Sequence, residues 1–436
     1  MSSTNQSISI INGRLIDPAN QIDDMLDLHI SQGHILAIGE KPSGFEAEKL
    51  IDATGRIICP GLIDLSARLR EPGFEPKGTI ASETRAAAYS GITTLVTLPD
   101  TNPVIDTPAV MELIRRRAKQ SAHARVLCLG ALTKNLNGKE LSEMAALQNA
   151  GCVAVTNAGK PLGNTLIERR ALEYASTFGI KVFIKPEDRH LRNDGCVHEG
   201  IISSRLGLPG YPEAAETVAV ARDIALAEAT GAHIHFQCIS TAKSVNKINR
   251  ACHDGINLTV DVAAHQLHLT EMDADDFNTL CHVDPPFRTL RDREALRQAV
   301  ATGSIQAICS DHQPHEPDAK DHPFPDSETG ISALETLLPL TLKLVDEKVL
   351  DLPTAIARLT IGPATIANLP FGRLDQGRTA DVCIFDPDSH WQLNANEMIS
   401  HGRNTPFANW EFRGKVTQTL FEGRITYDLD TQHERQ

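Results

Sequence analysis

The sequence predicts an α/β protein: a (β/α)₈ TIM-type barrel inserted into a small β-sandwich that both chain ends build together. Eight apolar β-type runs, each followed by a helix-length segment, fill residues 59–364 of the 436-residue chain. Shorter alternating runs flank them at residues 1–58 and 365–436. Even alternation of strand and helix over roughly 300 residues is typical of a closed parallel barrel.

The two ends of the chain carry short apolar runs divided by turn signals. Near the N-terminus, Asn12-Gly13 and Gln32-Gly33 separate β-type segments. The same pattern returns after residue 365 in FGRLDQGRTADVCIFDPDSHW and KVTQTLFEGRITYD. Because each stretch is too short to bury a core alone, we expect them to combine into one composite domain, 1–58 plus 365–436.

Between these ends, eight apolar runs predict the barrel strands. They lie at residues 62–65, 93–99, 125–133, 152–158, 181–187, 233–240, 258–265 and 305–312. The segments between them, such as TLIERRALEYASTFG, are rich in Ala, Leu, Glu and Arg with apolar residues three or four apart, which predicts helices. In such a barrel, reactive groups belong at the C-terminal ends of the strands.

Composition narrows the function classes. The formal net charge is −14 and the 42 Lys and Arg residues form no basic stripe, so nucleic acid is not an expected partner. There is no apolar run of about 18 residues and no signal-peptide pattern, so we expect neither a membrane span nor export. The nine cysteines are odd in number and widely spaced, which favours free thiols in the cytoplasm.

Short phrases follow the predicted strands in a specific order. They are PGLID (60–64), LREPG (69–73), TNP (101–103), PED (186–188), ISTA (239–242), DPPFR (284–288), SDHQPH (310–315), GRLDQGRTADVCIFDP (372–387) and NTPF (404–407). In this order and spacing the chain resembles a dihydroorotase of the amidohydrolase superfamily over essentially its full length. The resemblance implies a barrel of the metal-dependent hydrolase kind and the reversible closure of carbamoyl aspartate to dihydroorotate.

The resemblance also implies a zinc site. In that family the first strand supplies His-x-His, the fifth and sixth strands one His each, the eighth an Asp, and the fourth an acidic or carboxylated-lysine ligand. Zinc lowers the pKa of its bound water to about 7 and polarises the substrate carbonyl. The strand-eight Asp, which corresponds to Asp311, is then placed to accept and return a proton.

Most of the implied ligand positions carry other residues here. They are occupied by Ser66, Arg68, Asn157, Lys185 and Cys238. A hydroxyl is a poor zinc ligand, and a guanidinium does not deprotonate in proteins. Only Asp311 remains from the set, together with Asp64 ahead of the lost histidines. We therefore expect a degenerate, pseudo-dihydroorotase site without a metal.

The implied substrate positions have changed in charge as well. Arg70 stands where the family binds a substrate carboxylate, and His315 belongs to the same implied pocket. Two family asparagines correspond to Asp100 and Asp284, which place negative charge where a dianionic substrate would sit. We expect this charge to weaken substrate binding.

The two new cations suggest how the site stays stable. Buried carboxylates left without a metal would cost several kcal/mol each. We expect Arg68 and Lys185 to replace the zinc charge by pairing with carboxylates chosen from Asp64, Asp100, Asp284 and Asp311.

Two functions follow from these expectations. The first is a non-catalytic protein of de novo pyrimidine biosynthesis that stabilises aspartate carbamoyltransferase in an oligomer, as degenerate members of the resembled family do. The alternative is an active dihydroorotase, or an amidohydrolase acting on another cyclic amide, with zinc held by Asp311, Cys238 and some of His265, His312 and His315. His233 and His235 lie inside the sixth run, so we expect core hydrogen bonds from them rather than metal binding.

Overall fold

The computed structural model describes residues 6–121 and 123–430, and it contains the eight predicted barrel strands. They are β8 (Leu62–Ala67), β9 (Ile92–Thr97), β10 (Arg125–Ala131), β11 (Ala154–Thr156), β12 (Val182–Ile184), β15 (Ile234–Phe236), β16 (Leu258–Ala263) and β17 (Ala307–Cys309). All eight lie in one parallel sheet, from β8 to β17 in chain order. A parallel bridge between Ala67 and His312 brings the first and last strands together, so the predicted barrel is confirmed.

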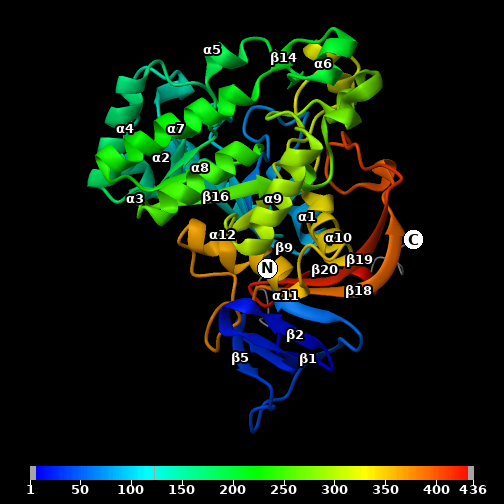
Figure 1. The fold of residues 1–436 in the computed structure, drawn as a ribbon. Helices are drawn as coiled ribbons and strands as arrows, with labels where there is room; N and C mark the ends of the chain where they lie inside the picture. Colours follow the sequence, from blue (N-terminus) through cyan, green and yellow to red (C-terminus); the bar gives the residue numbers. More distant parts are fainter. Residues whose placement is uncertain (1–5, 122, 431–436) are drawn as a thin grey trace.

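Helices cover the outside of the barrel (Figure 1). They are α1 (Ile80–Tyr89), α2 (Pro108–Ser121), α3 (Met144–Ala150), α4 (Thr165–Thr177), α7 (Glu213–Thr230), α8 (Ala242–His253), α9 (Leu290–Thr302) and α10 (Leu337–Asp346), followed by α11 (Leu352–Leu359) and α12 (Ile361–Ile366). Side-chain caps fix several starts: Thr79 accepts a hydrogen bond from the Ser82 N–H, and Thr241 accepts one from the Ser244 N–H.

A long connection between β12 and α7 was not expected in detail. It contains α5 (Arg189–Arg192), β13 (Val197–His198), α6 (Ile201–Leu206) and β14 (Gly210–Tyr211), and β13 and β14 pair with each other. This small sheet could not be predicted, because two-residue strands leave no hydrophobic period to detect. The connection matters because it carries Arg192 toward the ends of the barrel strands.

Two further sheets flank the barrel. One contains β1 (Ile8–Ile11), β4 (Leu28–Ser31), β5 (His34–Ile38) and β6 (Lys49–Asp52). The other contains β2 (Arg14–Asp17), β3 (Ile22–Met25), β7 (Ile57–Pro60), β18 (Val382–Gln392), β19 (Glu411–Phe421) and β20 (Arg424–Asp428). Here β7 from the N-terminal part pairs with β18 from the C-terminal part. In Figure 1 the blue N-terminal strands lie next to the orange and red C-terminal strands. Both ends of the chain therefore build one sheet.

A shared core joins the two flanking sheets. Ile10 and Leu28 from the N-terminal part pack in one buried cluster with Val382 and Leu420 from the C-terminal part. The domain boundaries, 1–58 with 365–436 and 59–364, remain predictions, and their outer ends at 1–5 and 431–436 lie outside the described residues. Within the described part, no helix combines the length and apolar character needed to cross a membrane.

Candidate functional site

The C-terminal ends of three barrel strands bring together Arg68, Asp100 and Asp311. Arg68 follows β8, and its Nε donates a hydrogen bond of 2.7 Å to Asp100 Oδ2, just beyond β9. Its Nη1 lies 3.7 Å from Asp311 Oδ1, beyond β17. The Arg68 side chain is only 14% exposed. The residue expected to replace one zinc-binding histidine thus lies between two carboxylates, as the charge argument predicted.

These contacts shift the pKa values of the pair. Burial alone would raise the pKa of Asp100, but the charge and hydrogen bond of Arg68 outweigh it and hold that pKa below its ordinary value. Burial would likewise lower the pKa of Arg68, and the charges of Asp100 and Asp311 raise it instead. Both groups are therefore ionised at neutral pH, and the guanidinium has no lone pair to offer a metal.

A second ion pair forms at the neighbouring strand ends. Lys185 Nζ, beyond β12, lies 2.9 Å from Asp284 Oδ2 and also donates to the Asp284 carbonyl at 2.6 Å. Arg192 approaches the same carboxylate at 3.2 Å and binds Glu187 at 2.9 Å. Burial would raise the pKa of Asp284, but Lys185 and Arg192 keep it low. Both cations at ligand positions are thus paired with aspartates from the set of four that the charge argument named.

Asp64 is bound differently from the expected cation pairing. Its Oδ1 accepts the Ser310 N–H at 2.9 Å, and its Oδ2 contacts the Ser310 hydroxyl. The side chain is buried on β8, and that burial raises its pKa to about 7 despite these hydrogen bonds. No cation among the described residues forms an ion pair with Asp64, so the expected pairing of Asp64 with Arg68 or Lys185 is absent.

Asp311 itself is held by short-range polar contacts. Ser66 Oγ donates to Asp311 Oδ1 at 3.3 Å, and Gln313 Nε2 donates to Oδ2 at 3.1 Å. His265, which the alternative ligand set includes, is buried near this carboxylate, and burial lowers its pKa to about 4. Its Nδ1 has no hydrogen-bond partner among the described residues. Asp311 lies beyond β17, and its expected status as an inactive remnant of the catalytic site remains a prediction.

Cys238 belongs to a different group from the one expected. Its Sγ lies 3.8 Å from Cys309 Sγ, and its backbone N–H donates to Asp261 Oδ1 at 2.6 Å. Among the described residues, only Cys238, Asp261 and Cys309 form a group whose potential ligand atoms all lie within 4.8 Å of one another. His235 Nε2 contacts the same aspartate at 3.0 Å inside β15, in agreement with its expected role in the core. Asp261 and Cys309 were not predicted, because neither stands in a recognised motif.

Arg70 and His315 lie next to each other at the mouth of the barrel. Arg70 Nε donates to the Pro314 carbonyl at 3.0 Å, and its Nη2 lies 3.0 Å from His315 Nε2. Lys77 Nζ contacts the other ring nitrogen at 3.2 Å. Burial and the charge of Arg68 lower the pKa of Arg70 to about 10, and no carboxylate of the described residues pairs with it. Unlike Arg68 and Lys185, Arg70 therefore has no carboxylate partner among the described residues.

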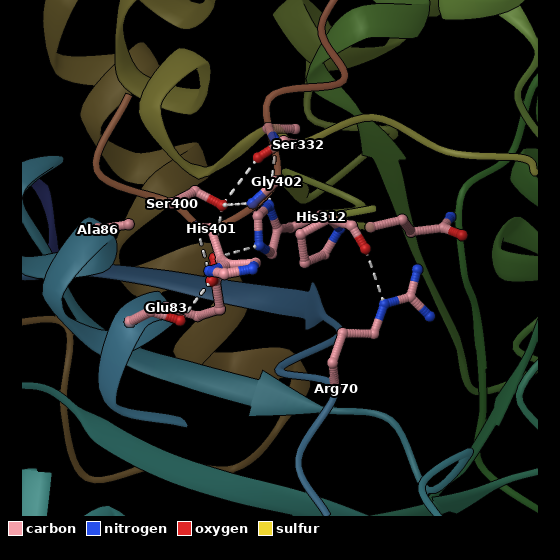
Figure 2. Close-up of polar contacts among 12 residues, drawn as sticks. Arg70, Glu83, Ala86, His312, Ser332, Ser400, His401 and Gly402 are labelled. Atoms are coloured by element: carbon pink, nitrogen blue, oxygen red, sulfur yellow. Dashed lines mark hydrogen bonds and ion pairs between the residues drawn. The ribbon is translucent and has the colours of Figure 1, made fainter. Parts of the chain in front are cut away.

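His312 has a structural environment that the motif alone did not reveal. Figure 2 shows its ring between Glu83 of α1 and the segment around Ser400. Its Nε2 lies 2.9 Å from Glu83 Oε2, and its Nδ1 accepts the Ala333 N–H at 3.0 Å. Ser400 Oγ donates to the same Glu83 oxygen at 2.7 Å. Both ring nitrogens are used, so this histidine braces three segments and is not available as a zinc ligand in this arrangement.

Asn157 has its own hydrogen-bond partners and does not contact the cluster of Arg68, Asp100 and Asp311, here called the Arg68 cluster. Its Oδ1 accepts the Thr133 hydroxyl at 2.7 Å, and its amide donates to the Lys160 carbonyl at 2.8 Å. Together with Lys185 it lines a cavity of about 300 Å³ between α4 and the ends of β11 and β12. Arg68, Asp100 and Asp311 are not among the residues that line this cavity. The cavity therefore adjoins Asn157 and Lys185 but not the contacts of Arg68.

Known proteins resemble this chain over nearly its full length. The model of the Dihydro-orotase-like family matches residues 55–244. A dihydroorotase-like protein of Pseudomonas aeruginosa is 48% identical over 97% of this chain and 100% of its own length. A dihydroorotase of Syntrophotalea carbinolica is 44% identical over 97% of this chain and 99% of its own length.

Solved structures resemble the fold at lower identity. The L-hydantoinase (dihydropyrimidinase) of Arthrobacter aurescens superposes with a TM-score of 0.86, at 22% identity, over 97% of this chain and 96% of that one. The dihydropyrimidinase of Brevibacillus agri gives a TM-score of 0.85 at 21% identity, over 97% and 95% of the two chains. These neighbours share the barrel with its flanking sheets.

Proposed function

This chain belongs to the dihydroorotase-like family, and on that premise we propose that it is a non-catalytic member acting as a structural partner of aspartate carbamoyltransferase in pyrimidine biosynthesis. One observation carries the proposal: Arg68 and Lys185 stand at implied ligand positions and are neutralised by Asp100, Asp311 and Asp284. A cation at a ligand position repels a metal ion and offers no lone pair. The residues present do not fit zinc there.

The loss of the metal leaves no evident electrophile for ring closure. In the family resemblance, zinc polarises the carbonyl and Asp311 transfers the proton. Here both carboxylate oxygens of Asp311 are already in polar contacts, with Ser66 and Arg68 at Oδ1 and with Gln313 at Oδ2. A retained barrel with an altered site is consistent with a function exerted through the surface of the molecule.

Co-purification tests the partnership. The full chain would be co-expressed with affinity-tagged aspartate carbamoyltransferase from the same organism, captured, and passed over a size-exclusion column. We expect both chains to elute together in a fixed ratio, and the transferase to lose activity more slowly on heating when the partner is present. Separate elution at micromolar concentrations, with no change in the heat stability of the transferase, would refute the proposed partnership.

An active enzyme with an unusual ligand set is the alternative, and one observation favours it. The buried group of Cys238, Asp261 and Cys309 offers two sulfur atoms and a carboxylate, a donor set that suits zinc chemically. Burial and nearby carboxylates raise the pKa of Cys238 to about 11 despite its hydrogen bond to Cys309, which opposes thiolate formation. Under this alternative, Cys309→Ser would remove both bound zinc and dihydroorotase activity. Under our proposal there is no activity to remove.

A further inference from the structure

A second cavity, of about 560 Å³, receives one cation from each of three separate parts of the chain. Arg85 comes from α1, three residues after Ser82, which lines the same cavity. Lys320 comes from the 3₁₀ turn Pro317–Lys320, and Arg403 comes from the segment 398–404. Positive charge therefore reaches this cavity from a helix, a turn and a loop segment that are distant in sequence.

None of these three cations forms an ion pair with a described residue. Arg85 and Arg403 are exposed, and neither side chain has a hydrogen-bond partner among the described residues. Lys320 is only 9% exposed, and its Nζ donates to the carbonyl groups of His282 at 3.2 Å and Glu328 at 2.5 Å. Burial lowers the pKa of Lys320 to about 8, although the charge of Glu328 opposes the shift. This is the direction expected of an ammonium group that no carboxylate contacts.

Negative charge at the cavity is limited to one side chain. Glu316 is the only carboxylate among the described residues that line it. Its Oε2 lies 3.8 Å from the Nζ of Lys77, a cation outside the lining that offsets part of this charge. The whole chain carries a formal net charge of −14, so the cavity is positive within an acidic protein. Its charge favours an anionic ligand.

Hydrogen bonds hold the segment 398–404 in place. The Ser400 N–H donates to Glu335 Oε1 at 3.0 Å, and the His401 N–H donates to Glu83 Oε1 at 3.1 Å. The Asn404 Nδ2 donates to two backbone carbonyl groups, each at 3.0 Å. The wall that carries Arg403 is therefore fixed without a ligand, as is usual for small-molecule sites.

These features define the class of the anion. Guanidinium groups bind phosphate through paired N–H donors, and a diphosphate group spreads its charge over two linked phosphates, so it can meet separate cations. We propose that this cavity binds a small organic diphosphate, whose diphosphate group contacts Arg85 and Arg403. The apolar residues of the lining, Leu280, Met398 and Ile399, would accept the organic part. The Arg68 cluster does not line this cavity, and the site does not depend on the proposed function.

Titration calorimetry on the full chain tests the anion class. The probe is inorganic pyrophosphate, in about 0.15 M salt to screen weak surface attraction and without divalent metal ions. Inorganic phosphate and succinate are the comparison anions. We expect pyrophosphate to bind at least tenfold more tightly than either. Binding of succinate as tight as that of pyrophosphate, or no binding of pyrophosphate at millimolar concentration, would overturn the proposal.

Four variants locate the bound anion. Arg85→Gln and Arg403→Gln remove exposed side chains without partners, so both should fold normally, and each should weaken pyrophosphate binding at least tenfold. The matched control is Arg116→Gln on α2, an exposed arginine that does not line the cavity and should bind as the parent does. Arg70→Gln should also leave the affinity unchanged, because Arg70 is not part of the lining. Parental affinity in both cavity variants, or a loss confined to Arg70→Gln, would contradict this location.

Discussion

Arg68 contacts carboxylates at the ends of two different strands, so its removal should leave both carboxylates without a cation and lower the stability of the protein. We predict that Arg68→Met lowers the free energy of unfolding by about 2 to 3 kcal/mol. This loss is smaller than the loss from breaking a fully buried ion pair, because Asp100 is partly exposed. Denaturant unfolding measures this directly. The double variant Arg68→Met with Asp100→Asn should recover most of the loss, and an unchanged midpoint in the single variant would contradict the pairing role.

Asp64 predicts a specific dependence of stability on pH. Its pKa of about 7 in the folded protein lies above the ordinary 3.8, so folding favours the protonated form. The stability that this group contributes is fully present below about pH 4 and is lost as the pH rises through about 7. The slope for one group is at most about 1.4 kcal/mol per pH unit.

The variant Asp64→Asn isolates this effect from other titrating groups. An amide can accept from the Ser310 N–H and donate to the Ser310 hydroxyl, as a protonated carboxyl group does. We predict that the parent loses stability relative to Asp64→Asn between pH 5 and pH 8, measured by urea unfolding. Parallel curves for the two proteins over this range would show that Asp64 is already ionised at pH 5.

Single residues also show the limit of reading a site from sequence. Asp100, Asp284, Lys185 and Arg68 could be predicted to lie together because each follows a strand in the same parallel barrel. Which cation would meet which carboxylate depends on side-chain direction and on the long connection between β12 and α7, whose helix α5 carries Arg192, and neither leaves a periodic signal. The contact of Cys238 with Cys309 was missed because Cys238 lies just beyond β15 and Cys309 ends β17, with β16 between these two strands.

At the level of elements, α1 is tied to the closing edge of the barrel. Glu83 receives hydrogen bonds from Ser400 and from the His401 N–H, and it contacts His312 (Figure 2). We predict that Glu83→Gln costs about 2 to 4 kcal/mol, because its amide places donors against groups that themselves donate. Thermal unfolding would show this, with Glu173→Gln as the surface control, expected to change stability by less than about 1 kcal/mol. Equal melting temperatures for the two variants would argue against a bracing role.

The elements themselves were largely predictable. Each of the eight apolar runs became a strand, because a strand buried on both faces leaves a continuous hydrophobic signal. Seven of the strands are shorter than their runs, as with β11 at three residues, whereas β8 extends two residues beyond its run, to Ala67. Long-range partners of the polar brace, such as Ser400 for Glu83, are separated by 317 positions and carry no local pattern.

At the scale of the whole molecule, both ends of the chain enclose the barrel sequence and meet in one sheet through β7 and β18. This arrangement could be expected from two short β-rich ends that lack cores of their own. The preserved architecture and the paired cations at the strand ends both support the proposal that the protein acts through its surface rather than through catalysis. Catalysis by the implied zinc chemistry would require those cations to be absent.

The measurement that tests this most directly is the interconversion of carbamoyl aspartate and dihydroorotate by the purified full chain with zinc supplied, assayed in both directions. We predict no turnover above that of the Asp311→Asn variant prepared in the same way, a comparison that also accounts for traces of host enzyme. Turnover that is present in the parent and lost in Asp311→Asn would contradict a non-catalytic barrel and establish an active dihydroorotase with an unusual site.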